Sequence, residues 1–137
     1  DLFAGLGTFS FPLSADARVL AVEGARDASL ALKAAGARAQ RNVAVEHRDL
    51  FRRPLSIQEL GRFDAVVLDP PRAGAKEQSQ ALAASGVPRI GYVSCSPSTF
   101  ARDAATLVAG GYRLERIWPV GQFRWSTHVE LVAAFSR

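Results

Sequence analysis

The sequence predicts an α/β fold built on an open, mostly parallel sheet that is covered by helices. Segments typical of buried strands alternate with segments typical of helices along most of the chain. Glycine or polar residues directly follow several of the predicted strands, which is where such sheets bind their ligands. Two strand-like segments near the C-terminus have no helix between them, so we expect at least one of them to run antiparallel.

Length and composition limit the classes of protein to which the chain can belong. Its 137 residues suffice for one core, and we expect a single domain over residues 1–137. Hydrophobic residues make up 48%, and no apolar run reaches the roughly 20 residues of a membrane span. Cys95 is the only cysteine, and the two histidines show no zinc-ligand spacing. We therefore expect no disulfide, no metal and no leader peptide, and a location in the reducing cytoplasm.

The basic side chains are mainly arginine. The chain has 17 basic and 13 acidic residues, a net charge of +4 and a pI near 10.0, and all but two of the basic residues are arginine. Arginine suits forked contacts with phosphates, which favours a nucleic acid as partner. The arginines are scattered along the sequence, however, and a GC-rich genome explains the same composition.

The chain begins at the end of a predicted strand. Residues 1–3 lead directly into the turn Ala4-Gly5-Leu6-Gly7, so most of the first strand is missing and we expect a piece of a longer protein. Pro12 interrupts a short helix over residues 8–14. The elements that follow are a strand over 19–22, an alanine-rich helix over 26–35 closed by Gly36, a strand over 43–47 and a short helix over 57–60.

The second half of the chain continues the alternation. Residues 64–68 are typical of a fully buried parallel strand, which Asp69-Pro70-Pro71 ends. Ser96 and Pro97 predict the start of a helix, with serine at the N-cap and proline in the first position. The other predicted elements are a helix over 76–85, a strand over 89–93, a helix end near 109 before Gly110-Gly111, and strands over 112–118 and 129–135.

A Gly-x-Gly turn followed by an acidic residue after the next strand is typical of nucleotide-binding sheets. Gly5 and Gly7 form this turn and Glu23 is the acidic residue, but the third glycine of dinucleotide-binding sheets is absent. A nucleoside without a pyrophosphate, such as S-adenosylmethionine, fits better. We expect Glu23 to bind its ribose, Asp49 to lie at its adenine and the glycine turn to bind its aminoacyl end. An ordinary tight turn is the alternative.

Three further polar residues stand at predicted strand ends or starts. Two prolines after Asp69 fix an extended bend that directs its carboxylate into the cleft. Cys95 directly precedes a helix N-terminus, where the dipole favours a thiolate. Glu130 shares one face of the last strand with His128, and a carboxylate there can act as a base. The alternatives are a turn aspartate, an inert buried thiol and a solvent-facing strand residue.

Four segments of distinctive sequence occur in order along the chain. They are DLFAGLGTFS at residues 1–10, DPPRAG at 69–74, SCSP at 94–97 and HVE at 128–130. Together they resemble the catalytic domain of the RNA uracil-C5 (5-methyluridine) methyltransferases, in order and approximate spacing. The resemblance implies the Rossmann-like fold of S-adenosylmethionine-dependent methyltransferases, with its first strand truncated here. The chain departs from the family's usual Asn, Asp and Pro at Ser96, Gly121 and Arg124.

The resemblance also implies the substrates and the residues that handle them. S-adenosylmethionine is the implied methyl donor, and a uridine in tRNA or rRNA is the implied acceptor. Cys95 is the implied nucleophile, Glu130 the base that removes a proton, and Asp69 a residue that orients the base or the donor. The residues with which it implies donor contacts are Phe3, Thr8, Glu23, Asp49 and Asp69. We expect a monomer that acts on RNA, not on DNA or at a membrane.

The target base must leave its stack to reach a buried thiol, and an aromatic side chain can hold it. The candidates for this contact are Tyr92, Phe123 and Trp125, and the alternative for each is that it belongs to the core.

Other functions stay open on the sequence alone. Methyltransferases that act on exocyclic amines share the Asp-Pro-Pro motif, although they usually have an aromatic residue where this chain has Arg72. Cytosine-C5 enzymes that use two cysteines are excluded by the single cysteine. A catalytically inactive RNA-binding module keeps the same fold, and a nicotinamide-dependent oxidoreductase uses a similar glycine turn.

Overall fold

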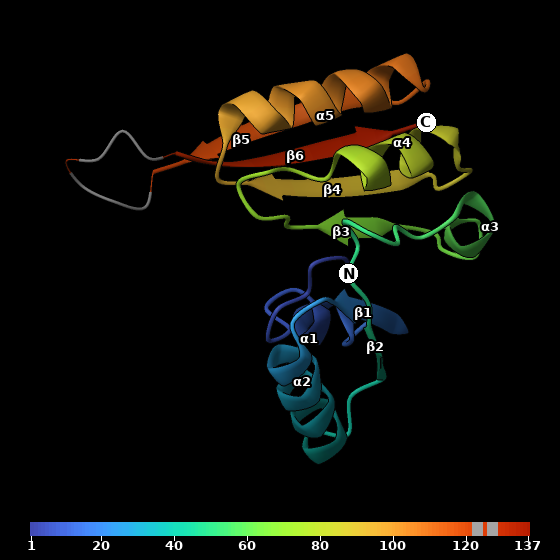
Figure 1. Cartoon of the computed structure of the whole chain (residues 1–137), viewed down its shortest axis with the longest axis vertical. Coiled ribbons are helices and arrows are strands. Elements are labelled where there is room, and N and C mark those ends of the chain that lie inside the picture. The colour runs from blue at the N-terminus through green and yellow to red at the C-terminus, as the bar shows by residue number, and fades with distance from the viewer. Residues whose placement is uncertain (122–124, 126–128) are drawn as a thin grey trace. The chain divides into compact units, whose positions relative to one another are not determined.

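The computed structural model describes residues 1–121, 125 and 129–137, which form two compact units. Unit 1 comprises Asp1–Arg53, and unit 2 comprises Pro54–Arg137. Both units combine strands with helices (Figure 1). Within the described residues, none of the helices has the length and apolar character needed to cross a membrane.

Unit 1 contains a parallel pair of strands. β1 (Val19–Glu23) pairs with β2 (Val43–His47), so that the two strands end side by side. The opening segment of the chain also lies parallel to β1, because Val22 donates to the carbonyl of Asp1 and accepts from the N–H of Ala4. The helices α1 (Ser10–Leu13) and α2 (Arg26–Arg38) complete the unit. Its core includes Ala4, Ala21 and Leu32, with Phe11, Val43 and Val45 packed against them.

The end of α2 differs from the sequence prediction, which placed it at Gly36. The helix continues to Arg38, and Gly36 is buried within it. Gln40 adopts a φ of 49°, the N–H of Arg41 donates to the carbonyl of Gly36 and the N–H of Gln40 donates to that of Ala37. This is a Schellman ending, with glutamine in the left-handed position that glycine usually occupies. The prediction was therefore wrong about which residue ends the helix.

Unit 2 is built on a four-stranded sheet in the order β3-β4-β6-β5. Its strands are β3 (Val66–Leu68), β4 (Arg89–Ser94), β5 (Arg113–Val120) and β6 (Glu130–Ser136). β3 and β4 are parallel, whereas β6 lies antiparallel between β4 and β5. The antiparallel strand predicted near the C-terminus is thus confirmed.

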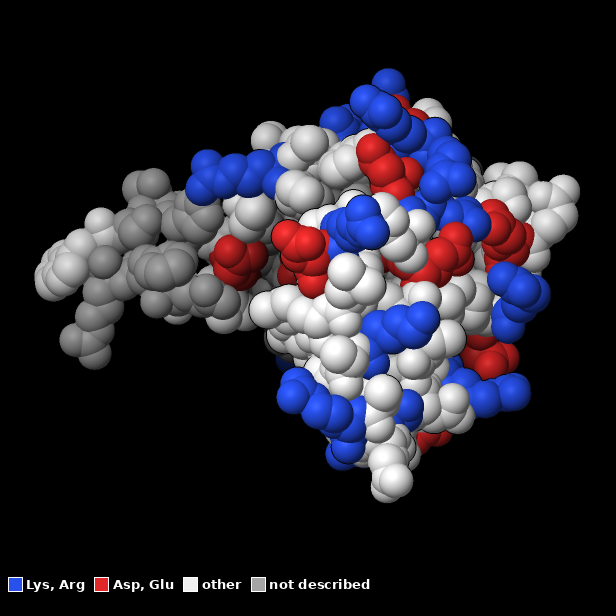
Figure 2. Space-filling view, turned by 60° about the horizontal axis from the view of Figure 1, so that its bottom comes forward, with Lys and Arg blue, Asp and Glu red and all other residues white. Residues whose placement is uncertain are grey.

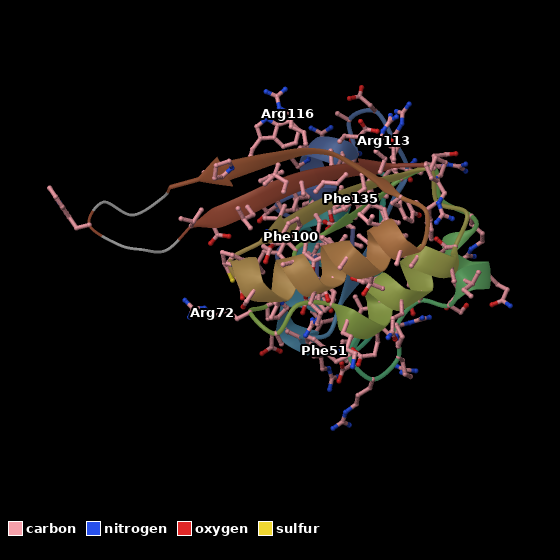
Figure 3. The ribbon with its side chains drawn as sticks, turned by 90° about the horizontal axis from the view of Figure 1, so that it is seen from above. Phe51, Arg72, Phe100, Arg113, Arg116 and Phe135 are labelled. Atoms are coloured by element: carbon pink, nitrogen blue, oxygen red, sulfur yellow. The ribbon has the colours of Figure 1, made fainter. Side chains whose placement is uncertain are left out.

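The helices of unit 2 are α3 (Ile57–Leu60), α4 (Lys76–Ala84) and α5 (Pro97–Ala109). α4 links β3 to β4 and α5 links β4 to β5, so both crossovers advance in the same direction along the sheet. Right-handed crossovers of this kind place both helices on the same face. Phe100 of α5 packs on that face, 5.4 Å from the ring of Tyr92 and 6.4 Å from the ring of Phe135 (Figure 3). These contacts form the centre of the core.

The carboxylate of Asp103 links the core to the loop before α4. It is fully buried and accepts hydrogen bonds from the hydroxyl of Tyr92 at 2.6 Å and the N–H of Ala75 at 2.7 Å. Its second oxygen pairs with the Arg102 guanidinium at 2.8 Å. Burial, followed by the hydrogen bond to Asp103, raises the pKa of Tyr92 far above its usual range. Tyr92 therefore remains a neutral donor, and the expectation that it stacks on a target base is wrong, because its ring lies in the core.

Gly74 lies where the loop approaches α5 most closely. It has a φ of +75°, and a Cβ there would lie 2.6 Å from both Asp103 and the Arg102 guanidinium. We expect Gly74→Ala to lower the free energy of unfolding by about 2 kcal/mol, through left-handed strain and displacement of this ion pair. Urea unfolding followed by circular dichroism measures the loss.

Gly86→Ala is the matched control for this substitution. A Cβ at Gly86 meets no atom within 4 Å, and its backbone lies outside the left-handed region. We expect its unfolding free energy to stay within about 0.5 kcal/mol of the wild type. An equal loss in the two variants would contradict a special role for position 74.

Candidate active site

The strand order brings three predicted catalytic residues to one edge of the sheet in unit 2. Asp69 follows β3, Cys95 follows β4, and Glu130 begins β6. Because β6 runs antiparallel to β4, its start lies at the same edge as the ends of β3 and β4. The three residues therefore come from three neighbouring strands.

The pairing of β4 with β6 brings Cys95 and Glu130 close together at the edge of the sheet. Ser94 is paired with Leu131, so continuing the register by one residue sets Cys95 opposite Glu130. Cys95 itself lies in the bend after β4, one residue beyond this last pair. Within β6, Glu130 lies on the face opposite to Phe135, and thus opposite to the face on which Phe100 packs, because side chains alternate along a strand. Both residues are half-buried.

The carboxyl groups of Asp69 and Glu130 interact electrostatically. Although Asp69 is an exposed residue as a whole, its carboxyl group is partly desolvated. This burial, followed by the negative charge of Glu130, raises the pKa of Asp69 above its usual value. The protonated form of Asp69 thus persists to higher pH beside Glu130 than it would in an ordinary aspartate.

A buried serine holds the turn that carries Cys95. The hydroxyl of Ser94 accepts from the N–H of Ser96 and donates to its carbonyl, both at 3.1 Å. α5 then begins at Pro97 with Ser96 at the N-cap, as the sequence predicted. The Ser96 side chain, however, caps no backbone N–H and instead lies 3.3 Å from the hydroxyl of Ser98. The turn around the thiol is therefore fixed by Ser94.

α5 also holds the loop that follows Asp69. The hydroxyl of Thr99 donates to the carbonyl of Arg72 at 3.0 Å, and the guanidinium of Arg102 donates to the carbonyl of Ala73 at 3.0 Å. Figure 3 shows Arg72 beside the N-terminal end of α5. The loop is thereby attached to the helix that begins two residues after Cys95.

The predicted donor-binding residues of unit 1 gather at the ends of its strands. One oxygen of Glu23 accepts from the N–H of Gly5 at 2.8 Å, and the other accepts from the N–H of Ala25 at 2.6 Å. The two glycines of the turn differ in their surroundings. A Cβ at Gly5 would face open space, whereas one at Gly7 would lie 2.7 Å from the ring of Phe11. Gly5 thus leaves room for a ligand, while Gly7 allows the turn to pack against α1.

Asp49 shapes its own loop. Its carboxylate accepts from the N–H groups of Phe51 and Arg52, at 3.0 and 3.3 Å. The ring of Phe51 is 42% exposed and lies 5.4 Å from the ring of Phe3, whose φ is +60°. Sequence reasoning missed Phe51, although its place just after a strand end was a usable signal. Thr8 is exposed, and its predicted contact with the donor stays a prediction.

Two predicted residues, Phe123 and His128, lie outside the described part of the chain. Trp125 is fully exposed. Among the described residues, no group of three or more His, Cys, Asp or Glu side chains is placed to hold a metal ion. On the face shown in Figure 2, basic side chains are interspersed with acidic ones, in keeping with the scattered arginines of the sequence.

The chain is similar to known RNA methyltransferases along its whole length. An uncharacterized RNA methyltransferase of Zymomonas mobilis is 60% identical over all of the chain and 34% of its own length. The 23S rRNA (uracil(1939)-C(5))-methyltransferase of Pseudomonas putida is 45% identical over 98% of the chain and 30% of its own length. The chain thus spans about a third of the length of these relatives.

A solved structure shows the same fold. The tRNA (uracil-54, C5)-methyltransferase of Pyrococcus abyssi, crystallised with S-adenosyl-L-homocysteine, matches with a TM-score of 0.86 and 31% identity. The match covers 98% of the chain and 33% of that protein. The predicted Rossmann-like methyltransferase fold is therefore confirmed.

The family model described as tRNA (Uracil-5-)-methyltransferase matches residues 1–137. The matched residues include Asp69, Cys95 and Glu130 at the edge of the sheet in unit 2, and Gly5 in the turn of unit 1. The predicted resemblance is confirmed, and the chain belongs to the tRNA (uracil-5-)-methyltransferase family.

Proposed function

We propose that this chain is the methyl-transferring part of a longer enzyme that methylates C5 of a uridine in tRNA or rRNA, with S-adenosylmethionine as donor. The observation that carries the proposal is the position of Cys95 and Glu130 beside the last residue pair of β4 and β6, at one edge of the sheet. The family supports the substrate class, since relatives are described as acting on uracil C5 in 23S rRNA and in tRNA. An amine methyltransferase has no need of a thiol paired with a base.

Cys95 acts as the nucleophile in this proposal. C5 of uracil is too weak a nucleophile to take a methyl group directly. When the thiolate of Cys95 adds to C6, a carbon–sulfur bond forms and the electrons of the C5=C6 double bond move to C5 and the neighbouring carbonyl. C5 becomes electron-rich as a result. Cys95 lies just before the N-terminus of α5.

Glu130 acts as the base that completes the reaction. After methylation, C5 carries both a methyl group and a proton. The carboxylate of Glu130 removes that proton, the C5=C6 double bond re-forms, and the thiolate of Cys95 leaves C6. The two residues flank the last pair of β4 and β6, which suits this order of steps, because both must reach neighbouring atoms of one flat ring. We assign to Asp69 the orientation of Glu130 or of the donor.

The residues of unit 1 fit a nucleoside donor. S-adenosylmethionine, when bound, supplies the methyl group. The open space at Gly5 allows a ligand to approach the backbone, and the Glu23 carboxylate keeps lone pairs for ribose hydroxyls after accepting two N–H groups. The exposed ring of Phe51, in contact with Phe3, offers an apolar surface for the adenine. We place Asp49 at the adenine, and Gly7 and Thr8 at the aminoacyl end.

The first test follows a labelled methyl group from S-adenosylmethionine into uridine-containing RNA. We expect Cys95→Ser to lower transfer to uracil C5 about a thousandfold, because a hydroxyl does not supply the nucleophile. Binding of S-adenosylhomocysteine, measured by calorimetry, should stay within about twofold. Ser98→Ala, an exposed substitution three residues away, should behave as the wild type. Label on an exocyclic amine, or full activity in Cys95→Ser, would overturn the proposal.

A second test separates the base from the nucleophile. Glu130→Gln should still form the carbon–sulfur bond but release the RNA slowly, since the amide does not accept the C5 proton. We expect a protein–RNA band that survives denaturing electrophoresis, and no such band when Cys95→Ser is added to the same protein. A folded Glu130→Gln variant that forms no band would argue against Glu130 as the base.

A third test uses the pH dependence of stability. The pKa of Asp69 in the folded state is raised above the ordinary value of 3.8. The contribution of the protonated Asp69 to the unfolding free energy is therefore fully present below pH 3.8, and it is lost as the pH rises through the raised pKa. Asp69→Asn removes the charge that burial and Glu130 disfavour at pH 7. We expect a gain in unfolding free energy at pH 7, below about 1 kcal/mol because solvent screens the carboxyl, and no gain at pH 3.

The control is Asp64→Asn, an exposed residue just before the same strand. The difference in unfolding free energy between Asp64→Asn and the wild type is measured at the same two pH values. A loss of stability in Asp69→Asn at pH 7 would contradict the electrostatic account of this site.

A further inference from the structure

We propose that Thr99 is a positioning residue for methyl transfer, because its hydroxyl joins the loop after Asp69 to the turn that carries Cys95. The inference rests on the function proposed above. Thr99 is the third residue of α5 and is half-buried. Its Oγ1 lies 3.0 Å from the carbonyl oxygen of Arg72 and 3.3 Å from that of Ser96. One hydroxyl thus contacts both loops that deliver catalytic groups to the edge of the sheet.

The hydrogen bond from Thr99 to the carbonyl of Arg72 also restricts the position of Asp69. Only Pro70 and Pro71 separate the two residues, and each proline ring fixes its own φ. The residue before a proline is also restricted to extended conformations. The chain from Asp69 to Arg72 therefore has few torsions left to vary. Fixing the carbonyl of Arg72 consequently limits where the Asp69 carboxyl can lie.

The contact of Thr99 with the carbonyl of Ser96 restricts the turn that carries Cys95. Ser96 directly follows Cys95. Its carbonyl oxygen accepts from the hydroxyl of Ser94 at 3.1 Å and lies 3.3 Å from the hydroxyl of Thr99, whose one proton it shares with the carbonyl of Arg72. Ser94 fixes the turn from the strand, while Thr99 fixes it from the helix. The separation between the thiol of Cys95 and the carboxyl of Asp69 thus depends on a hydroxyl that belongs to neither loop.

Neighbouring contacts allow the role of Thr99 to be tested without unfolding the protein. The guanidinium of Arg102 holds the carbonyl of Ala73, and the carboxylate of Asp103 holds the N–H of Ala75. These bonds keep the loop attached to α5 when the Thr99 hydroxyl is removed. What is lost is a contact at Arg72, three residues from Asp69, so we expect an effect on the reaction that exceeds the effect on stability.

A bond from threonine to the carbonyl three residues earlier is common in the first turn of a helix and is by itself a local feature. The bond to Arg72 is different, since it spans 27 residues of sequence. Thr106 provides the comparison within the same helix. It is also half-buried, but its hydroxyl donates at 3.2 Å to the carbonyl of Arg102, within α5 itself.

The experiment compares Thr99→Val, which keeps the shape but removes the hydroxyl, with Thr99→Ser and the control Thr106→Val. We expect Thr99→Val to lower kcat for transfer to uracil C5 about tenfold, because reacting groups tolerate little misplacement. KM for the RNA and the Kd for S-adenosylhomocysteine should stay within about twofold. Thr99→Ser should recover most of the wild-type kcat, and Thr106→Val should match the wild type.

Alkylation of Cys95 by iodoacetamide gives a readout that needs no RNA and no methyl donor. Cys95 is the only cysteine in the chain, so the reaction reports on one site. We expect the rate at pH 7 to fall about threefold in Thr99→Val, because the turn that carries the thiol loses its contact with Thr99 and no longer holds the sulfur in one orientation. Thr106→Val should alkylate at the wild-type rate across the pH range.

The outcomes separate this proposal from the proposed function. An active Thr99→Val variant with wild-type kcat and wild-type alkylation would overturn the role of Thr99 and leave the function intact. Slower alkylation in Thr99→Val, in a protein that transfers no methyl group to uracil, would support the positioning of the thiol and reject the function. If Thr99→Val does not fold, Thr99→Ala decides by the same criteria.

Discussion

The pairing of β6 with β4 is the constraint on which the site depends. Side chains alternate between the two faces of a sheet, so a slip of one residue would move Glu130 to the other face. The register is set on the other face, where Tyr92 and Phe135 pack against Phe100 of α5. A hydrophobic contact on one side of the sheet therefore determines which polar groups meet on the other side.

The helix that completes this core also serves the loops. Asp103 of α5 is a fully buried carboxylate whose oxygens accept bonds from the Tyr92 hydroxyl, the Ala75 N–H and the Arg102 guanidinium. Burying a charge is costly, and such a group is tolerated only when its partners are in place. The same helix surface holds the carbonyls of Arg72 and Ala73. The helix α5 thus both packs in the core and holds the loop that follows Asp69.

Much of the fold was predictable because its signals are local: apolar runs, the Ser96-Pro97 helix start and the prolines after Asp69 each act on neighbouring residues. The features that depend on residues far apart in the sequence were not predictable. The hydroxyl of Tyr92 finds Asp103 only once α5 covers the sheet, so the sequence could not show that this ring is core. The end of α2 was missed because glutamine took the left-handed position. Cys95 and Glu130 lie near each other because β6 pairs with β4. The pattern of strands in the amino-acid sequence does not specify that pairing.

The order of strands along the chain differs from their order in the sheet, and this has a consequence for biosynthesis. β6 is the last of the described strands in sequence, yet it lies between β4 and β5. While the ribosome has not yet delivered residues 130–136, β4 and β5 each present an edge with unpaired backbone groups, a form open to aggregation. Glu130 arrives with the strand that closes this gap. Nascent chains that stop short of it lack both a finished sheet and the residue that we propose as the base.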